Sequence, residues 1–235
     1  MKPFGAEVMF YATLMKKNNF QRDKMMLACH NQSGRSMIEM LGVLAIIGLL
    51  SIGGLAGFAE IMMQYRVNRT VEQVVEMSSY LAQIGEQSGS YNGLSNSVAV
   101  KLKAVPAGVI VNESSLTNLF GGNITITPSG LLAADDKQAF AITYTGISQE
   151  ACIRLAAQNW QSGQSGSLLG VGFAASATGA TNAEKAILTN CSSSSATGNN
   201  AYVVGCAKNL PLDVASAMVG CNCSNDSCAM VAKYY

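Results

Sequence analysis

The chain has 235 residues, of which 12% are charged and 49% are hydrophobic, and its formal net charge is +1. This composition is too apolar for a disordered chain, and the near-neutral charge offers no basic patch for nucleic acid. We therefore predict a globular domain with an additional segment, and no nucleic-acid partner.

The charge is unevenly distributed along the chain. The first 34 residues carry five basic and two acidic residues, a net of +3, whereas the remainder carries ten basic and twelve acidic residues, a net of −2. A basic segment before an apolar run is typical of a cytoplasmic tail under the positive-inside rule. Residues 1–34 are therefore predicted to lie in the cytoplasm and the rest of the chain outside it.

Residues 40–59 form a run of twenty residues without a charge, MLGVLAIIGLLSIGGLAGFA. This is about the length that an α-helix needs to cross the hydrocarbon layer. Five glycines in the run would weaken a helix in water but permit close helix packing in a bilayer. The run is too long and begins too late for a typical cleaved secretory signal. A plain single-span anchor would explain the run but not the residues before it.

A carboxylate, Glu39, lies directly before this run, in the sequence Gly34-Arg35-Ser36-Met37-Ile38-Glu39. An ionisable group there costs about 2–3 kcal/mol, so it should have a partner. Cleavage after Gly34 would create an α-amine at Arg35, and an amine and a carboxylate that are desolvated together can neutralise each other.

The combination of Gly34, Glu39 as the fifth residue after it, and the apolar run resembles the class III signal of type IV prepilins. The resemblance implies that a membrane peptidase cleaves between Gly34 and Arg35 and methylates the new amine of Arg35. It also implies that Glu39 pairs with the terminal amine of a neighbouring subunit. Arg35 departs from the family, which usually has Phe, Met or Leu here.

Helical periodicity continues beyond the apolar run. Val67, Val71, Val74, Ser78 and Leu81 recur at helical spacing, with Gly85 and Gly89 as stop signals. We predict one helix over residues 35–87, with a transmembrane part at about 40–59.

Short elements are predicted for the rest of the chain. They are a helix at 98–104, strands at 109–111 and 123–127, a turn at 128–130, a strand at 139–145, a helix at 149–160, a strand at 201–206, a helix from Pro211 to Met218, and a strand at 228–233. Residues 162–200 are rich in Gly, Ser, Ala and Thr and are predicted to form a long loop region with a weak helical piece near 183–188.

This order of elements resembles the head of a type IV pilin, and residues 140–160 are similar to type IVb pilins of thin conjugative and toxin-coregulated pili. A long leader is also a mark of the type IVb branch. The resemblance implies an α+β fold of the type IV pilin class, with a long N-terminal membrane-spanning helix packed on an antiparallel β-sheet head and a disulfide-stapled C-terminal region. The expected domains are a cleaved leader at 1–34, the helix at 35–87 and the head at 88–235.

Six of the seven cysteines lie downstream of the apolar run, which is typical of a disulfide framework outside the cytoplasm. A zinc site is the weaker interpretation, because only Cys221 and Cys223 are close neighbours and no His follows them. The resemblance implies a staple between Cys152 and Cys221. The other four could pair as Cys191–Cys206 and Cys223–Cys228, although six cysteines allow fifteen connectivities.

Catalytic chemistry finds little support in the sequence. The only histidine, His30, lies in the leader, which leaves the mature chain without Ser–His–Asp, Cys–His or His-ligated metal chemistry. Asp135 and Asp136 are interpreted as a solvated turn. We predict no enzymatic activity, no catalytic, cofactor-binding or metal-binding residue, and no cofactor.

The resulting hypothesis is a pilin subunit held in the bacterial inner membrane as a precursor and found in an extracellular pilus fibre when mature. Its expected partners are further copies of itself, prepilin peptidase, the inner-membrane assembly machinery and, before assembly, the membrane. Two alternatives stay open: a minor pilin or type II secretion pseudopilin, and a surface-binding protein on a single-span anchor. A hydrolase is a remote further alternative.

Overall fold

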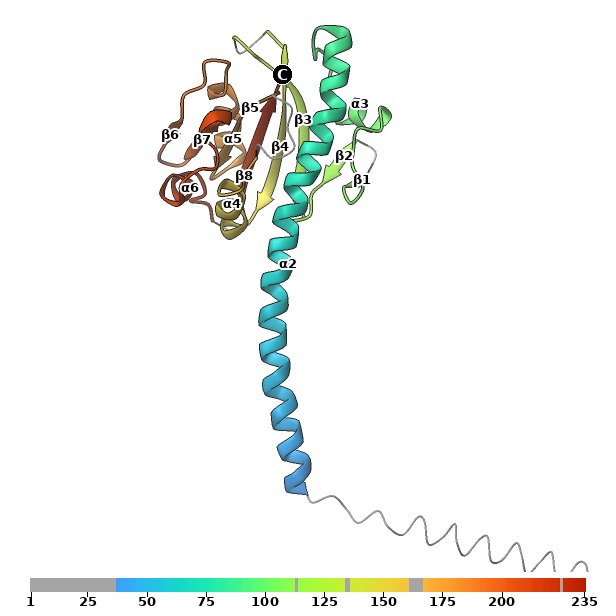
Figure 1. The fold of residues 1–235 in the computed structure, drawn as a ribbon, viewed down its shortest axis with the longest axis vertical. Helices are drawn as coiled ribbons and strands as arrows, with labels where there is room; N and C mark the ends of the chain where they lie inside the picture. The colour runs from blue at the N-terminus through green and yellow to red at the C-terminus, as the bar shows by residue number, and fades with distance from the viewer. Residues whose placement is uncertain (1–36, 113, 134–135, 161–166, 225) are drawn as a thin grey trace, which may run out of the picture. The chain divides into compact units, whose positions relative to one another are not determined.

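The computed structural model describes residues 37–112, 114–133, 136–160, 167–224 and 226–235 (Figure 1). The chain divides into two compact units between Ala59 and Glu60. The first unit contributes the beginning of helix α2 (Met37–Ser88), and the second contains the end of α2 and all later elements.

Helix α2 confirms the predicted long N-terminal helix. It continues through Gly85 and ends at Ser88, where Gly89 adopts a φ of +68° and its N–H donates to the Gly85 carbonyl at 2.8 Å. Gly85 is therefore not the stop signal. It allows the Tyr91 ring to approach the helix, since a Cβ at Gly85 would lie 2.1 Å from that ring.

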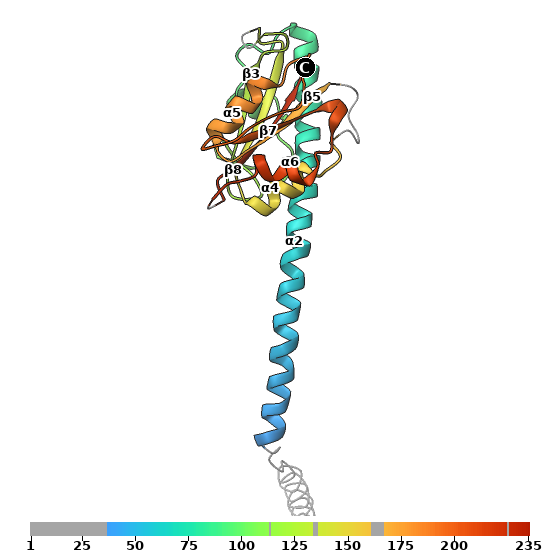
Figure 2. The ribbon, with the colours of Figure 1, turned by 90° about the vertical axis from the view of Figure 1, so that its left-hand side faces the viewer.

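The head contains one antiparallel sheet of eight strands in the order β1-β2-β3-β4-β8-β5-β7-β6. The neighbouring strands β8, β5 and β7 of this sheet can be followed in Figure 2. Their bounds are β1 Ile110–Asn112, β2 Ser115–Thr117, β3 Asn123–Ser129, β4 Ala139–Ile147, β5 Leu168–Ala174, β6 Ser194–Ala196, β7 Tyr202–Cys206 and β8 Cys228–Tyr234. The C-terminal strand β8 lies in the middle, between β4 and β5, and every residue in it is buried. Because both faces of β8 are covered, its sequence is nearly continuously apolar.

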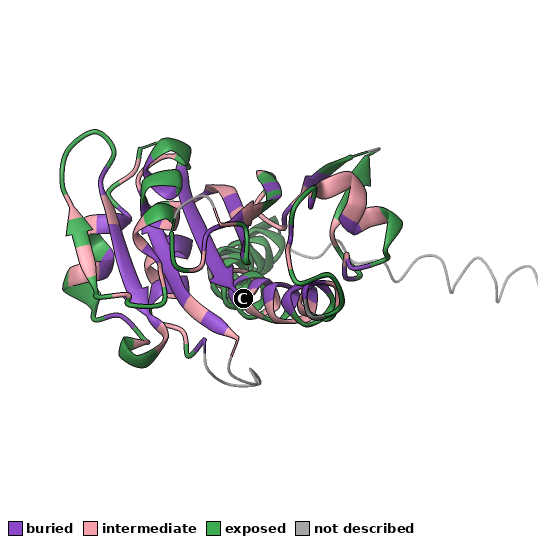
Figure 3. Cartoon of the chain, turned by 90° about the horizontal axis from the view of Figure 1, so that it is seen from above, coloured by how far each residue is buried: buried purple, intermediate pink, exposed green. Residues whose placement is uncertain are grey.

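The two faces of the sheet contribute to different cores. Met230, Ala232 and Tyr234 of β8 belong to the main core, which also contains the buried stripe of α2 (Figure 3). The members of that stripe are Val67, Val74, Met77 and Leu81. Val231, one residue out of phase, packs with Ala183 and Ile187 at the helix α5 (Ala177–Ala186) on the other face. The period of two along β8 therefore separates the face under α2 from the face under α5.

The prediction of a long loop region at 162–200 is wrong. This segment forms β5, α5 and β6, and β5 is a buried strand in the sheet. The sequence of β5, LLGVGFA, looked unlike a strand because of its glycines. Gly172 serves close packing instead, since a Cβ there would lie 2.7 Å from the Cβ of Ala183.

Proline and helix boundaries also differ from the predictions. β3 continues through the predicted turn to Ser129, and Pro128 is tolerated because β2 pairs with β3 only as far as Ile124, which leaves one side of Pro128 without a strand partner. Helix α6 (Val214–Gly220) begins after Pro211, because the Asp213 carboxylate accepts the Ser216 N–H at 2.8 Å and caps the helix there.

Helix α4 (Gln149–Ala156) is shorter than predicted. The Trp160 indole N–H donates to the Leu155 carbonyl at 2.9 Å, so the buried ring satisfies a carbonyl at the helix end as the chain turns away. The remaining elements are α3 (Asn96–Lys101), close to its predicted position, and a single 3₁₀ turn, η1 (Ala207–Asn209). Strand β2, which pairs with β1, was not predicted.

Candidate functional site

The residues predicted for processing lie at the beginning of the described chain. Glu39 is in the first turn of α2 and is exposed. Gly34 and Arg35, together with the whole predicted leader and His30, lie outside the described residues. A carboxylate in a first helical turn is stabilised by the helix dipole.

The apolar run follows Glu39 on the same helix. Its large side chains are exposed, among them Leu44, Ile47 and Leu50. Within the described residues, one helix is long and apolar enough to cross a membrane, judged by its length and composition alone. Exposed apolar side chains in such number need either lipid or another protein around them.

Five glycines punctuate this apolar surface: Gly42, Gly48, Gly53, Gly54 and Gly57. A Cβ at any of them would meet no atom of the described chain within 4 Å. These glycines therefore do not serve packing inside the described subunit. Small residues on a helix surface permit the close approach of another helix.

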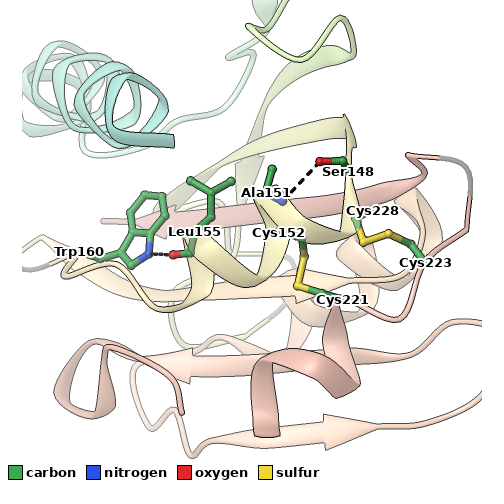
Figure 4. The surroundings of a disulfide bond; sticks show 8 residues. All are labelled: Ser148, Ala151, Cys152, Leu155, Trp160, Cys221, Cys223 and Cys228. Carbon is green, nitrogen blue, oxygen red and sulfur yellow. Dashed lines mark hydrogen bonds between the residues drawn. A yellow bond between two sulfur atoms is a disulfide. The ribbon is translucent and has the colours of Figure 1, made fainter. Parts of the chain in front are cut away.

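Three cystines hold the C-terminal region of the head, and Figure 4 shows two of them, Cys152–Cys221 and Cys223–Cys228. They join Cys152 to Cys221, Cys191 to Cys206 and Cys223 to Cys228, the same three pairs that the sequence analysis considered. Cys152 and Cys221 are buried, and their bond connects α4 to the end of α6 across a sequence separation of 69. Cys29 lies outside the described residues.

An ion-pair cluster that sequence analysis missed lies where α2 enters the second unit. The Arg154 guanidinium contacts the Glu60 carboxylate through both terminal nitrogens, at 2.8 and 3.1 Å. It also contacts Glu150, one helical turn earlier, at 2.7 Å. The hydrogen bond that Arg154 donates to the Glu60 carboxylate raises the pKa of Arg154. The i,i+4 spacing of Glu150 and Arg154 was a detectable signal, whereas nothing local pointed to Glu60.

The acidic turn after β3 has a structural role. The Asp136 carboxylate accepts four backbone N–H groups, those of Leu131, Leu132, Ala133 and Gln138, at 2.6–3.1 Å. These hydrogen bonds, the one from Leu131 foremost, hold the pKa of Asp136 far below its usual range. Asp135 lies outside the described residues.

One cation is buried on the α5 face of the sheet. The Lys233 ammonium donates to the Glu184 backbone carbonyl at 3.1 Å, and burial lowers the pKa of Lys233. The Ser129 hydroxyl donates to the Glu184 carboxylate. Within the described residues, no group of three or more His, Cys, Asp or Glu side chains is placed to hold a metal ion.

Comparison with known protein families identifies the family of this chain. The model described as "PilS N terminal" matches residues 64–206, which is more than half of the chain. The chain belongs to this family of pilins. The match covers residues 64–88 of α2, strands β1 to β7 and α5, so the family assignment rests on the head rather than on the apolar run.

Two further comparisons accompany the family match. A search of curated proteins finds no match to this pilin. Among solved structures, the pilin is similar to a type IV b pilin from Salmonella typhi, with 18% sequence identity and a TM-score of 0.38. That alignment covers 68% of this chain and 97% of the other.

Proposed function

We propose that this pilin is a structural subunit that is processed by prepilin peptidase and polymerises into an extracellular type IV pilus. The observation that carries the proposal is the exposed apolar surface of residues 40–59 on α2, with Glu39 in the first turn before it. A lone carboxylate beside so much apolar surface calls for a cationic partner when that surface is covered.

The proposed life of the subunit has two stages. The precursor lies in the bacterial inner membrane, with leader 1–34 in the cytoplasm and the apolar run in lipid. Cleavage after Gly34 then releases the Arg35 amine, which is methylated and pairs with Glu39 of a neighbouring copy. The helix 35–87 enters the fibre core, and the head 88–235 faces outward.

Close helix packing supports this second stage. The five glycines of the run have no contact to satisfy within the described subunit, whereas neighbouring helices in a fibre could approach one another at these positions. The inner-membrane assembly machinery would supply the work of moving each helix out of lipid. The role is structural rather than catalytic, and contact with cells or surfaces would be made by the heads.

The test is a Glu39→Ala variant in the native host, with Glu72→Ala as a matched control, because Glu72 is also an exposed acid on α2. The expected result is that Glu39→Ala enters the membrane and is cleaved but is missing from sheared surface filaments, while Glu72→Ala is incorporated. N-terminal sequencing and intact mass of the filament protein should find a chain that begins at Arg35, with or without one added methyl group.

Other outcomes would favour the alternatives. A native chain that retains its basic leader and never appears in filaments would indicate a surface-binding protein on a single-span anchor. A processed chain that is present at low copy number in filaments made of another pilin would indicate a minor pilin or a pseudopilin.

A further inference from the structure

A polar pocket lies at the β6 edge of the sheet, opposite the β1 edge. It has a volume of about 360 Å³ and lies among the edge strand β6, strand β7 and the segment that connects β7 to α6. This volume is at the lower end of the range for small-molecule sites. The lining residues are Ser193, Ser194, Ser195, Val203, Val204, Asn209, Pro211, Leu212, Asp213 and Ser216.

The lining of this pocket is mostly polar and contains one acidic residue. Four serines, one asparagine and one aspartate supply the polar groups, and no Lys, Arg or His lines the pocket. The hydrogen bond from the Ser216 N–H lowers the pKa of Asp213, so the carboxylate is ionised at neutral pH. The lining therefore carries a formal charge of −1, which disfavours phosphate, sulfate and other anions.

Hydrogen-bonding capacity remains at the two most polar side chains. Asn209 donates from its amide nitrogen to the Ser193 hydroxyl at 3.1 Å, which leaves its carbonyl oxygen as an acceptor. The Asp213 carboxylate accepts from the N–H and the hydroxyl of Ser216, both at 2.8 Å, and retains further lone pairs. A ligand here must donate several hydrogen bonds while presenting an apolar surface to Pro211 and Leu212.

A disulfide holds the walls of the pocket in place. Cys191 lies two residues before Ser193, and its partner Cys206 lies three residues before Asn209. The cross-link thus connects the two chain segments that carry the serines and the asparagine. A wall that is already ordered loses less conformational entropy when a ligand binds.

We propose that this pocket binds one neutral sugar residue of a glycan. Adjacent sugar hydroxyls donate to the Asp213 carboxylate and the Asn209 carbonyl oxygen, and the C–H face of the ring packs against the apolar part of the lining. A single residue in an open pocket binds weakly. Repetition of the pocket along a fibre would raise the apparent affinity by about 10²–10⁴, a step that rests on the proposed function.

The experiment uses the full-length chain in a detergent without a sugar headgroup, so that the detergent does not compete. Saturation-transfer NMR is measured with the methyl glycosides of glucose, galactose, mannose and N-acetylglucosamine. We expect at least one to bind, and Asp213→Asn to raise its Kd about tenfold or more, because a hydrogen bond to a charged group is lost. Asparagine also caps helices well, so α6 should be retained.

Two matched pairs of variants separate the pocket from general effects. Asp226→Asn changes another exposed aspartate outside the lining and should leave binding unchanged. Ser195→Trp should fill the pocket and abolish binding, whereas Ser115→Trp, at an exposed position of β2, should not. Intact mass under non-reducing conditions verifies that each variant retains its three disulfides.

Three results would overturn the proposal. They are the absence of binding by all four glycosides, binding that neither pocket variant changes, and binding of N-acetyl-lysine amide in place of the sugars. The last result would assign the pocket to a cationic side chain. Because the detergent-solubilised chain is not polymerised, failure here is distinct from failure to form filaments.

Discussion

Arg154 joins Glu60 across a sequence separation of 94 residues, with both terminal guanidinium nitrogens on the two carboxylate oxygens. This geometry connects α4 of the head to the first residue of α2 that belongs to the same compact unit. Bidentate pairs are the most directional of the ion pairs, so this contact defines where the head begins to hold the helix.

Breaking this pair should loosen the helix locally. We expect Glu60→Gln to increase backbone hydrogen exchange severalfold at residues 60–66, with little change in the sheet, because an exposed ion pair contributes little to global stability. Hydrogen exchange detected by mass spectrometry measures the effect. Glu150→Gln is the control, since it leaves the Arg154–Glu60 contact in place. Equal exchange in both variants would argue against a specific role of Glu60.

The Cys152–Cys221 cystine should contribute more to the free energy of unfolding than the Cys223–Cys228 cystine does. Because it closes a separation of 69 residues, replacing both cysteines by Ala should cost about 4 kcal/mol in the free energy of unfolding. The control is the double replacement of Cys223 and Cys228, whose separation of 5 predicts a loss of about 2 kcal/mol. Urea unfolding of the detergent-solubilised chain gives both values, and similar losses would contradict the loop-length argument.

Asp136 should make stability depend on pH. Its pKa is lower in the folded chain than the ordinary value of 3.8, so its stabilisation is present above that value and is lost as the pH falls toward the folded pKa. Asp136→Asn should therefore be less stable than the unmodified chain at neutral pH, and the difference should shrink below about pH 4. Thermal unfolding across this range tests the sign. Asp226→Asn, at an exposed turn, is the control for the removal of one aspartate charge.

Gln73 occupies a buried position on α2 with no hydrogen-bond partner within the described chain for either polar atom of its amide. Replacing it by Leu should stabilise the head by about 1 kcal/mol, because an unsatisfied buried amide carries a desolvation cost. Chemical unfolding measures the gain. Thr70→Val is the control, since the Thr70 hydroxyl already donates to the Arg66 carbonyl at 2.8 Å and its loss should bring no gain. A destabilised Gln73→Leu variant would show that the amide is satisfied in solution.

Local patterns were sufficient for several elements. The stripe from Val67 to Leu81 predicted the buried face of α2, and the alternation in residues 139–145 predicted β4. The helix predicted from residue 149 begins there in the structure as α4, where the Ser148 hydroxyl accepts the Ala151 N–H. Each of these signals depends on neighbours within one or two turns or on one strand, so the sequence contains the whole cause.

The errors occurred where packing overrode local composition. Gly170 and Gly172 were interpreted as loop residues, yet they lie in β5. Glycine is needed at these two strand positions because neighbouring backbone and side chains leave no room for a Cβ. β8 was predicted as a strand, but its central position follows from pairing with β4 and β5, which are distant in sequence. Such choices depend on contacts between segments that no local window contains.

The amino-acid sequence alone determined that this chain begins its long helix with an acid before twenty uncharged residues, since charge and apolarity are properties of the residues themselves. Only the tertiary structure decided that the Arg154 guanidinium pairs with Glu60 and which glycines allow close packing of a neighbouring element. It also decided that Ser193, Asn209 and Asp213 line one pocket. These relationships arise when separate segments compete to bury their apolar faces, and that competition is resolved only by the folded chain as a whole.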